Sequence, residues 1–218
     1  MTAFAGDFAI VAEGGTDQVV LKALLEAWFE DDEVVVNYEQ PEHRGDGVAG
    51  DGGWNLVFQY LENGRYRDAL QVNRFLVVHL DTDVAHSCGV EMPAGSDPND
   101  VVSAVIAKLR ALIEDAHQDR VIFAIAVDCI ECWLLPLVFD RSQRVKRRKQ
   151  TGCIQAVNHK LRQLNQAGIA SAAGDKFFDR YRELASGFST RRSVEESADN
   201  PGFAKLLDQL RLLPLPLD

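Results

Sequence analysis

The sequence predicts an α/β fold in which helices cover both faces of a four-stranded parallel sheet. Four apolar stretches have the length and composition of buried strands. They span residues 8–12, 33–38, 74–80 and 121–127. Segments with helical periodicity separate them, and this alternation is typical of a parallel sheet. The strands are apolar throughout rather than at every second position, which indicates that both faces of the sheet are buried.

The segments between the strands carry their own signals. A Glu-Gly-Gly-Thr-Asp turn follows the first strand, and Thr16 or Asp17 can cap a helix predicted over residues 17–30. The acidic, glycine-rich segment 39–53 has no regular pattern, and the sequence assigns it no role. Two further helices are predicted, over residues 54–61 and 100–116.

The C-terminal third differs in character from what precedes it. It begins with a basic run, Arg141–Lys149, that lacks hydrophobic periodicity. Short helices are predicted after it, near residues 153–166, 175–186 and 200–212. The final Leu-Pro-Leu-Pro-Leu-Asp cannot continue a helix. We therefore expect an α/β domain over residues 1–140 and a basic, mainly helical extension over residues 141–218.

Composition narrows the class of protein. Hydrophobic residues make up 46% of the 218-residue chain, enough to bury a core. No apolar run approaches the roughly 20 residues needed to cross a bilayer. The first residues show neither a basic region nor the apolar stretch of a secretory signal. We expect a soluble, cytoplasmic protein with no membrane partner.

Charge is distributed unevenly along the chain. Residues 1–139 carry 8 basic and 24 acidic side chains, whereas residues 140–218 carry 15 basic and 9 acidic ones. The net charges of the two parts are therefore −16 and +6. This asymmetry suggests an acidic part that holds metal and a basic part that meets phosphate groups. A basic helical surface exposed to solvent is an equally good interpretation.

Two of the four cysteines form a C-x-x-C motif, Cys129 and Cys132. A zinc site requires a second pair of ligands, which Cys153 and His159 supply only loosely by their spacing. The favoured interpretation is that these cysteines are small apolar residues at the end of a buried strand. Zinc binding or redox chemistry is the alternative.

Acidic residues stand at the ends of several predicted strands. Glu13 follows the first strand, Asp81 and Asp83 follow the third, and Glu131 comes soon after the fourth. Ligands of parallel α/β sheets bind beyond the carboxyl ends of the strands. Mg²⁺ prefers oxygen ligands and is often held by a few carboxylates. Strand-end acids also serve as helix caps, but a metal ion is the simplest way to stabilise several carboxylates in one place.

The sequence resembles the Toprim domain in three places. These are the first strand with its Glu-Gly-Gly-Thr-Asp turn, the strand ending in Asp-Thr-Asp, and the strand leading to Glu131. That domain occurs in topoisomerases, bacterial primases and nucleases of the overcoming-lysogenization-defect type. The resemblance covers roughly residues 7–140, with a long inserted loop before Arg74. It implies a Toprim-like Rossmannoid sheet in which Glu13, Asp81 and Asp83 bind Mg²⁺, or Mn²⁺, and catalyse phosphodiester chemistry.

The closer likeness is to small stand-alone Toprim nucleases. Their additional acids correspond to Asp17 and Glu131, and this pair implies a second metal ion. Topoisomerase chemistry needs a tyrosine nucleophile, and no domain of this chain is built around one. The resemblance therefore implies a nuclease that hydrolyses DNA or RNA, including tRNA. Similar proteins are effectors of antiphage defence, often beside an ABC-type ATPase, and often form homodimers.

Basic residues supply the remaining expectations. A cation that faces the developing charge aids phosphoryl transfer, and Lys176 is the expected catalytic cation. Its rivals are Lys160, Arg191 and Arg192. Phosphate contacts are expected from the basic run, which is alternatively a mobile surface loop or an interface with an acidic partner. The run's expected nucleic-acid-binding residues are Arg144, Lys146, Arg147, Arg148 and Lys149.

Two other functions remain open. The chain is alternatively a non-catalytic regulatory or binding subunit of an ATPase complex. It has no G-x-x-x-x-G-K-[ST] motif, so that control by ATP would require a partner. A phosphatase that forms an aspartyl phosphate also uses an Asp-x-Asp after a strand. Such enzymes place it after the first strand, and the third-strand position here disfavours them.

Overall fold

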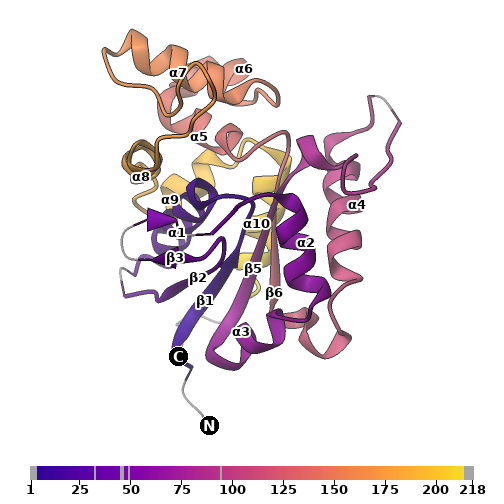
Figure 1. Ribbon diagram of the computed structural model, residues 1–218. Helices are drawn as coiled ribbons and strands as arrows, with labels where there is room; N and C mark the ends of the chain where they lie inside the picture. The colour runs from indigo at the N-terminus through magenta and orange to yellow at the C-terminus, as the bar shows by residue number, and fades with distance from the viewer. Residues whose placement is uncertain (1–3, 32, 45–46, 49, 94, 214–218) are drawn as a thin grey trace.

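The computed structural model describes residues 4–31, 33–44, 47–48, 50–93 and 95–213 (Figure 1). Four parallel strands form its main sheet in the order β2-β1-β5-β6. They are β1 (Gly6–Val11), β2 (Val36–Gln40), β5 (Asn73–Asp81) and β6 (Val121–Ala126). The predicted α/β fold with a four-stranded parallel sheet is confirmed. The ending predicted not to continue a helix lies, after residue 213, outside the described residues.

Alternate residues of the strands enter two separate hydrophobic cores, as the two-residue period of a strand requires. In β1, Phe8 and Ile10 enter one core, and Ala9 and Val11 enter the other. The second core lies under α2, α3 and α4. These helices cover one face of the sheet (Figure 1) and comprise α2 (Trp54–Glu62), α3 (Tyr66–Val72) and α4 (Pro98–Arg110).

The first core contains residues from α1 and from five helices that follow β6. The helices that contribute are α1 (Gly15–Phe29), α5 (Glu131–Val138), α7 (Cys153–Gln163), α8 (Phe178–Ala185), α9 (Arg191–Ser197) and α10 (Pro201–Leu210). The expected helical extension is present, and it shares this core with the sheet. It therefore does not form an independent hydrophobic unit.

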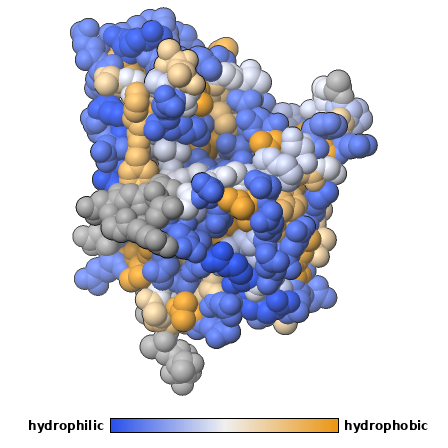
Figure 2. Space-filling view, in the orientation of Figure 1, coloured by the Kyte–Doolittle hydropathy of each residue, from blue (hydrophilic) through white to orange (hydrophobic). Residues whose placement is uncertain are grey.

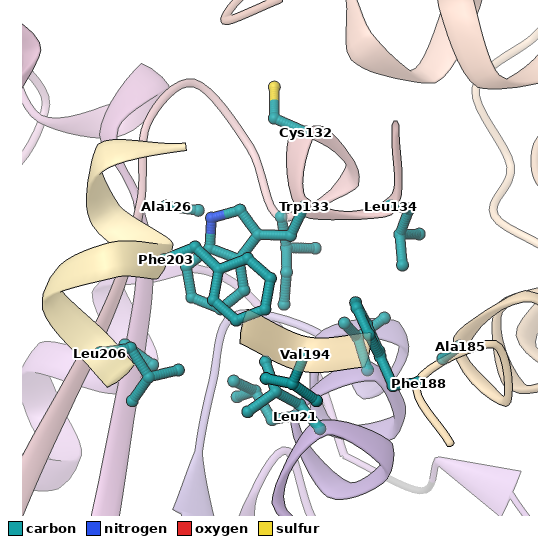
Figure 3. Close-up of a cluster of buried hydrophobic side chains, with 14 of the residues drawn as sticks. Leu21, Ala126, Cys132, Trp133, Leu134, Ala185, Phe188, Val194, Phe203 and Leu206 are labelled. Atoms are coloured by element: carbon teal, nitrogen blue, oxygen red, sulfur yellow. The ribbon is translucent and has the colours of Figure 1, made fainter. Parts of the chain in front are cut away.

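Helix α10 packs directly on β6. The Gln209 side chain donates to the Phe123 carbonyl and accepts the Phe123 N–H, both at 2.9 Å, so it occupies the outer edge of the strand. Gly202 permits this approach, because a Cβ there would lie 1.8 Å from the Ile125 carbonyl oxygen. The Phe203 ring stacks on Trp133 of α5 with centroids 4.8 Å apart (Figure 3).

Several elements were not predicted. Helices α3 and α9 each have seven residues, too few to show two turns of periodicity. Helix α4 ends at Arg110 and a separate 3₁₀ turn spans Asp115–Arg120, so the helix predicted to residue 116 is too long. The segment 39–53 contains a short hairpin of β3 (His43–Arg44) and β4 (Gly47–Val48). Short pieces complete the chain: 3₁₀ turns at Thr82–Val84 and Arg141–Gln143, and α6 (Arg144–Arg147).

The visible surface is mainly polar. Figure 2 shows hydrophilic residues over the upper part of the molecule, where Figure 1 places α6 and α7. Within the described ranges, no helix combines the length and the hydropathy that a bilayer crossing requires.

Replacing Phe203 by alanine tests whether α10 belongs to the core. Phe203 is fully buried, so we expect the free energy of unfolding to fall by about 3–5 kcal/mol. Urea denaturation followed by circular dichroism measures it. The control is Leu212→Ala, at a side chain that is 85% exposed, for which we expect a change within about 0.5 kcal/mol. A small effect at Phe203 would show that α10 packs loosely.

Candidate metal centre

Carboxylates gather at the carboxyl edge of the sheet, as predicted. Strands β1, β5 and β6 are neighbours and parallel, so their carboxyl ends share one edge. Glu13 lies two residues beyond β1, Asp81 is the last residue of β5, and Glu131 is the first residue of α5. Asp83 lies in the 3₁₀ turn that follows β5. Their charges act on one another, and the pKa of Glu13 is raised in part by Asp17 and Asp83.

Glu13 links β1 to β5. Its Oε1 accepts the Asp81 backbone N–H at 2.7 Å, and its carbonyl accepts the Gly53 N–H at 2.7 Å. Gly52 packs against the same carbonyl, where a Cβ would lie 2.3 Å from the oxygen. The glycines that end the 39–53 segment thus let it close over Glu13. Burial, with the nearby acids, raises the pKa of Glu13 to about 7.

Asp17 is buried in the first turn of α1, with 2% of its surface exposed. Its Oδ2 accepts the Gly14 N–H at 2.8 Å, so it closes the turn that precedes the helix. Its Oδ1 lies 3.8 Å from the Lys176 Nζ. The predicted N-cap, Thr16 or Asp17, is wrong, because Gly14 is the N-cap and α1 begins at Gly15; Asp17 instead closes the turn from the third helical position.

Asp81 faces a buried histidine of the same strand. His79 is fully buried, and its Nε2 lies 3.1 Å from Asp81 Oδ1, although the two atoms are not aligned for a hydrogen bond. The His79 Nδ1 lies 2.6 Å from the Ala124 carbonyl, which fixes the ring. Burial raises the pKa of Asp81. Burial alone lowers the pKa of His79, but the facing Asp81 carboxyl outweighs it and raises that pKa. The pair therefore retains a proton near neutral pH.

Lys176 meets Glu131 and Asp17 from the C-terminal extension. Its Nζ lies 2.7 Å from Glu131 Oε1, and Glu131 Oε1 also accepts the Tyr181 hydroxyl. Glu131 is fully buried, and burial alone would raise its pKa. The Lys176 ammonium and the hydrogen bonds outweigh burial and hold the pKa of Glu131 below its ordinary value. The same carboxylates raise the pKa of Lys176 against the opposing effect of burial.

A tight turn positions Lys176. Ala170 and Lys176 form an antiparallel bridge, and the Phe177 N–H donates to the Ile169 carbonyl at 2.8 Å. Gly174 supplies the positive φ of 97° that the turn requires. Asn158 of α7 holds this hairpin, because its Oδ1 accepts the Ile169 N–H at 2.7 Å and its Nδ2 donates to the Ala170 carbonyl at 2.9 Å. Helix α7 thus sets where Lys176 lies.

One carboxylate at the site was missed from the sequence. Asp128 follows β6 with a positive φ of 65°, and its N–H donates to Thr82 Oγ1 at 2.8 Å. Its carbonyl accepts the Asp83 N–H at 3.1 Å, so it joins the ends of β5 and β6. Burial, then the charge of Asp128, raises the pKa of Asp83. An acid directly after the strand predicted over residues 121–127 was the available signal.

In ligand type these residues suit a hard cation, although among the described residues the only group of three or more possible metal ligands that lie within 4.8 Å of one another is Asp128, Cys129, Cys132 and Cys153. All the charged ligands are carboxylates, which Mg²⁺ and Mn²⁺ prefer. Glu131 Oε2 is buried without a hydrogen-bond partner among the described residues, and Asp81 Oδ1 has only the misaligned His79 Nε2 beside it. Burial, and to a lesser extent neighbouring acids, raises the pKa values of Glu13, Asp81 and Asp83. Asp17 and Glu131, expected to hold a second ion, instead contact the Lys176 ammonium.

The basic run divides into structural and exposed residues. Arg147 is buried, donates to Asp199 Oδ2 at 2.7 Å and donates to the Glu196 carbonyl at 2.6 Å. The expectation that Arg147 contacts nucleic acid is therefore wrong, because its guanidinium is enclosed within the fold. Arg148 also pairs with Asp199, at 3.2 Å, but is 55% exposed. The other members, Arg144, Lys146 and Lys149, are exposed.

The alternative candidates for the catalytic cation contact groups outside the candidate site. Lys160 Nζ lies 5.9 Å from the centre of the Phe139 ring. The Arg191 guanidinium covers the Trp28 ring at 4.3 Å, and Arg192 pairs with Glu196 at 2.8 Å. Of these four cations, only Lys176 has ion-pair contacts with carboxylates of the candidate site within the described residues.

Comparison of the chain with models of protein families, with curated proteins and with solved structures gave no match. The geometry of the site therefore carries the functional argument.

The raised pKa of Glu13 predicts how the stability of the chain responds to pH in the presence of a chelator. Its folded pKa of about 7 exceeds its ordinary value of 4.5, so the folded state holds this proton more tightly than the unfolded state. The resulting stabilisation is complete below about pH 4.5 and is lost as the pH rises through about 7. We expect Tm to fall across this range and the fall to be shallower in Glu13→Gln.

The control is Glu62→Gln, at an exposed glutamate of α2, which should keep the wild-type slope. Added Mg²⁺ should raise Tm more at about pH 8 than at about pH 5, because protons compete with the metal for the carboxylates. Differential scanning calorimetry gives both quantities. A Tm that stays level or rises in the chelated wild type would contradict the raised pKa.

Proposed function

We propose that this chain is a metal-dependent nuclease that hydrolyses phosphodiester bonds of DNA or RNA. The observation that carries the proposal is the common position of Glu13, Asp81 and Asp83 at the carboxyl edge of the sheet, where the charge of Lys176 acts on Asp81 and Asp83. A parallel sheet binds its ligands at this edge. Carboxylates beside an ammonium offer a site for a divalent cation and a cation that faces phosphate oxygens.

Glu13, Asp81 and Asp83 would hold one Mg²⁺ or Mn²⁺. When bound, the ion polarises the phosphate and lowers the pKa of a bound water. A single ion is the simpler assignment, because Lys176 already contacts the two acids that a second ion would use. The resemblance to two-metal nucleases favours a second ion instead, and metal stoichiometry distinguishes the two.

The side chains have distinct tasks in this proposal. Glu13 Oε1 is engaged by the Asp81 N–H, which leaves Oε2 to contact the metal ion. Lys176, anchored by Glu131, stabilises negative charge that develops on the phosphate. His79, two residues earlier in β5, positions the Asp81 carboxyl.

The exposed cations of the basic run would hold flanking phosphates. Arg144, Lys146, Arg148 and Lys149 are exposed and close in sequence. Such contacts add affinity that depends on salt and not on sequence. The further roles suggested by the resemblance are action in antiphage defence, on tRNA among other RNAs, beside a separate ABC-type ATPase and as a homodimer. They belong to the same proposal and rest on the resemblance alone.

A cleavage assay tests the proposed activity. Purified protein is incubated with DNA, RNA and tRNA in Mg²⁺ or Mn²⁺, with and without EDTA. We expect cleavage that requires metal and falls at least about 100-fold in Asp81→Asn/Asp83→Asn. The matched control is Asp119→Asn, at an exposed aspartate beside the amino end of β6, which should cleave like the wild type.

The alternative is a non-catalytic regulatory or binding subunit of an ATPase complex. A folded, metal-binding chain that cleaves none of these substrates, alone or with a candidate ATPase, would replace the nuclease proposal by this one. Calorimetry that detects no binding of Mg²⁺ or Mn²⁺ would remove the metal site itself.

Lys176→Met tests the catalytic cation. We expect kcat to fall about 100-fold with little change in the affinity for Mg²⁺, because the ammonium faces phosphate and not metal. The control is Lys160→Met, at a partly buried lysine of α7 whose Nζ lies over the Phe139 ring, away from the carboxylates. Loss of the ion pair should also lower the free energy of unfolding by about 2 kcal/mol, less than for a fully buried pair, because Lys176 is 34% exposed.

A second substitution separates folding from catalysis. Glu131→Gln in the Lys176→Met background removes the unpaired buried charge and should restore much of the stability. The double variant should remain slow in cleavage. Recovery of both properties would mean that Lys176 is needed only for folding.

A further inference from the structure

Three cysteines and one aspartate meet beside the start of α5. They are Asp128, Cys129, Cys132 and Cys153, and their candidate ligand atoms all lie within 4.8 Å of one another. Cys132 and Cys153 are joined by a disulfide, whereas the Cys129 thiol is free. Cys153 begins α7, so the fold brings a third sulfur to the C-x-x-C from 21 residues away. His159, the other expected supplement, is exposed and bonds with Gln163.

The three cysteines belong to the first hydrophobic core, and their sulfur atoms also lie close to a carboxylate. In Figure 3 the Cys132 sulfur points away from the cluster formed by Trp133 and Leu134. Asp128 Oδ2 lies 3.6 Å from Cys129 Sγ and 3.9 Å from Cys132 Sγ. The expectation that these cysteines serve only as small apolar residues does not explain a carboxylate held among their sulfurs.

The donor set fits zinc. Zn²⁺ binds thiolate sulfur at about 2.3 Å and carboxylate oxygen at about 2.0 Å in tetrahedral sites, so neighbouring ligand atoms lie roughly 3.3–3.8 Å apart. Four ligand atoms within 4.8 Å of one another need only small side-chain adjustments to reach this arrangement. Four protein ligands leave no position for substrate, which is typical of structural zinc sites.

We propose that the reduced chain binds one Zn²⁺ through Asp128, Cys129, Cys132 and Cys153. A dithiol reductant supplies two electrons and two protons that convert the Cys132–Cys153 disulfide into two thiols, and is itself oxidised to a disulfide. Zn²⁺ then forms three Zn–S bonds and one Zn–O bond, and the three thiols release three protons. The Lys149 ammonium acts on the Asp128 carboxylate and offsets part of the resulting negative charge.

The zinc site would fix both partners of the buried ion pair. Cys132 is adjacent to Glu131 in α5, and Cys153 begins α7, whose Asn158 holds the hairpin of Lys176. One Zn²⁺ would therefore connect α5, which carries Glu131, to α7, which positions Lys176. Under oxidising conditions the disulfide makes the same connection without metal. This inference is independent of the proposed nuclease activity.

The test measures zinc directly in the full-length chain. Protein is reduced with a phosphine, stripped with a chelator, loaded with Zn²⁺ and dialysed, and the metal is counted by mass spectrometry. We expect one Zn²⁺ per chain. Co²⁺ in its place should give the intense visible absorption of a tetrahedral ion and a thiolate-to-cobalt charge-transfer band.

Cys129→Ser is the decisive variant, because Cys129 lies outside the disulfide and its loss leaves that bond intact. We expect its zinc affinity to fall at least about 100-fold, with the Co²⁺–thiolate band weakened. The matched control is Cys88→Ser, at the other buried free cysteine, which should bind like the wild type.

Asp81→Asn/Asp83→Asn is the control for zinc held by the carboxylate site, and it should retain one Zn²⁺ per chain. A reduced wild type that binds no zinc would overturn the inference, as would a Cys129→Ser variant that binds it unchanged. Zinc lost only in Asp81→Asn/Asp83→Asn would assign the ion to the carboxylates, and would also overturn it.

Discussion

Buried negative charge at one edge of the sheet is the constraint on which the rest of this structure depends. Glu131 is fully buried and Asp17 nearly so, and each such charge costs several kcal/mol unless it is paired. Lys176 supplies the pairing charge and Tyr181 a further hydrogen bond. Both come from the helical extension. The extension therefore has to fold back over the carboxyl edge, and its packing on β6 follows from that requirement as much as from its apolar faces.

This arrangement gives a physical meaning to the uneven charge along the chain. The acidic part concentrates carboxylates where three strands end, and the basic part provides the ammonium that contacts two of them. Some basic residues instead stabilise the extension itself, as Arg147 does with Asp199. The exposed remainder of the basic run is what is left for phosphate groups. The net charge of a segment thus overstates the charge that it offers to a partner.

The parts of the fold that could be predicted depend on local pattern and on parallel topology. Continuous apolar stretches predicted β1, β5 and β6, whereas the second strand, predicted over residues 33–38, runs over Val36–Gln40 and is largely polar and half-buried. The rule that parallel strands share their carboxyl edge predicted that Glu13, Asp81 and Glu131 lie at one edge. Asp128 was missed because its place at the site depends on a left-handed backbone conformation immediately after β6. No periodicity in the sequence reports such a conformation.

The sequence did not predict contacts between segments that lie far apart along the chain. Lys176 could not be separated from Lys160, Arg191 and Arg192, because the choice depends on a hairpin that α7 holds from outside. The enclosure of Arg147 depends on Asp199, 52 residues later. The third cysteine is likewise 21 residues from its partner. In each case the deciding interaction joins residues whose separation has no local signature.

The connection between the cysteines and the ion pair explains why a loosely patterned extension can hold a defined site. Glu131 and Lys176 must stay within hydrogen-bond distance, since separating them would leave a carboxylate buried without a counter-charge. Hydrophobic packing of short helices such as α8 tolerates small shifts, but an ion pair does not. A link at Cys132 and Cys153 restrains α5 against α7, and Asn158 transmits that restraint to the Lys176 hairpin. The Cys132–Cys153 disulfide, or the proposed zinc ion, therefore lies next to the elements that must keep Glu131 and Lys176 paired.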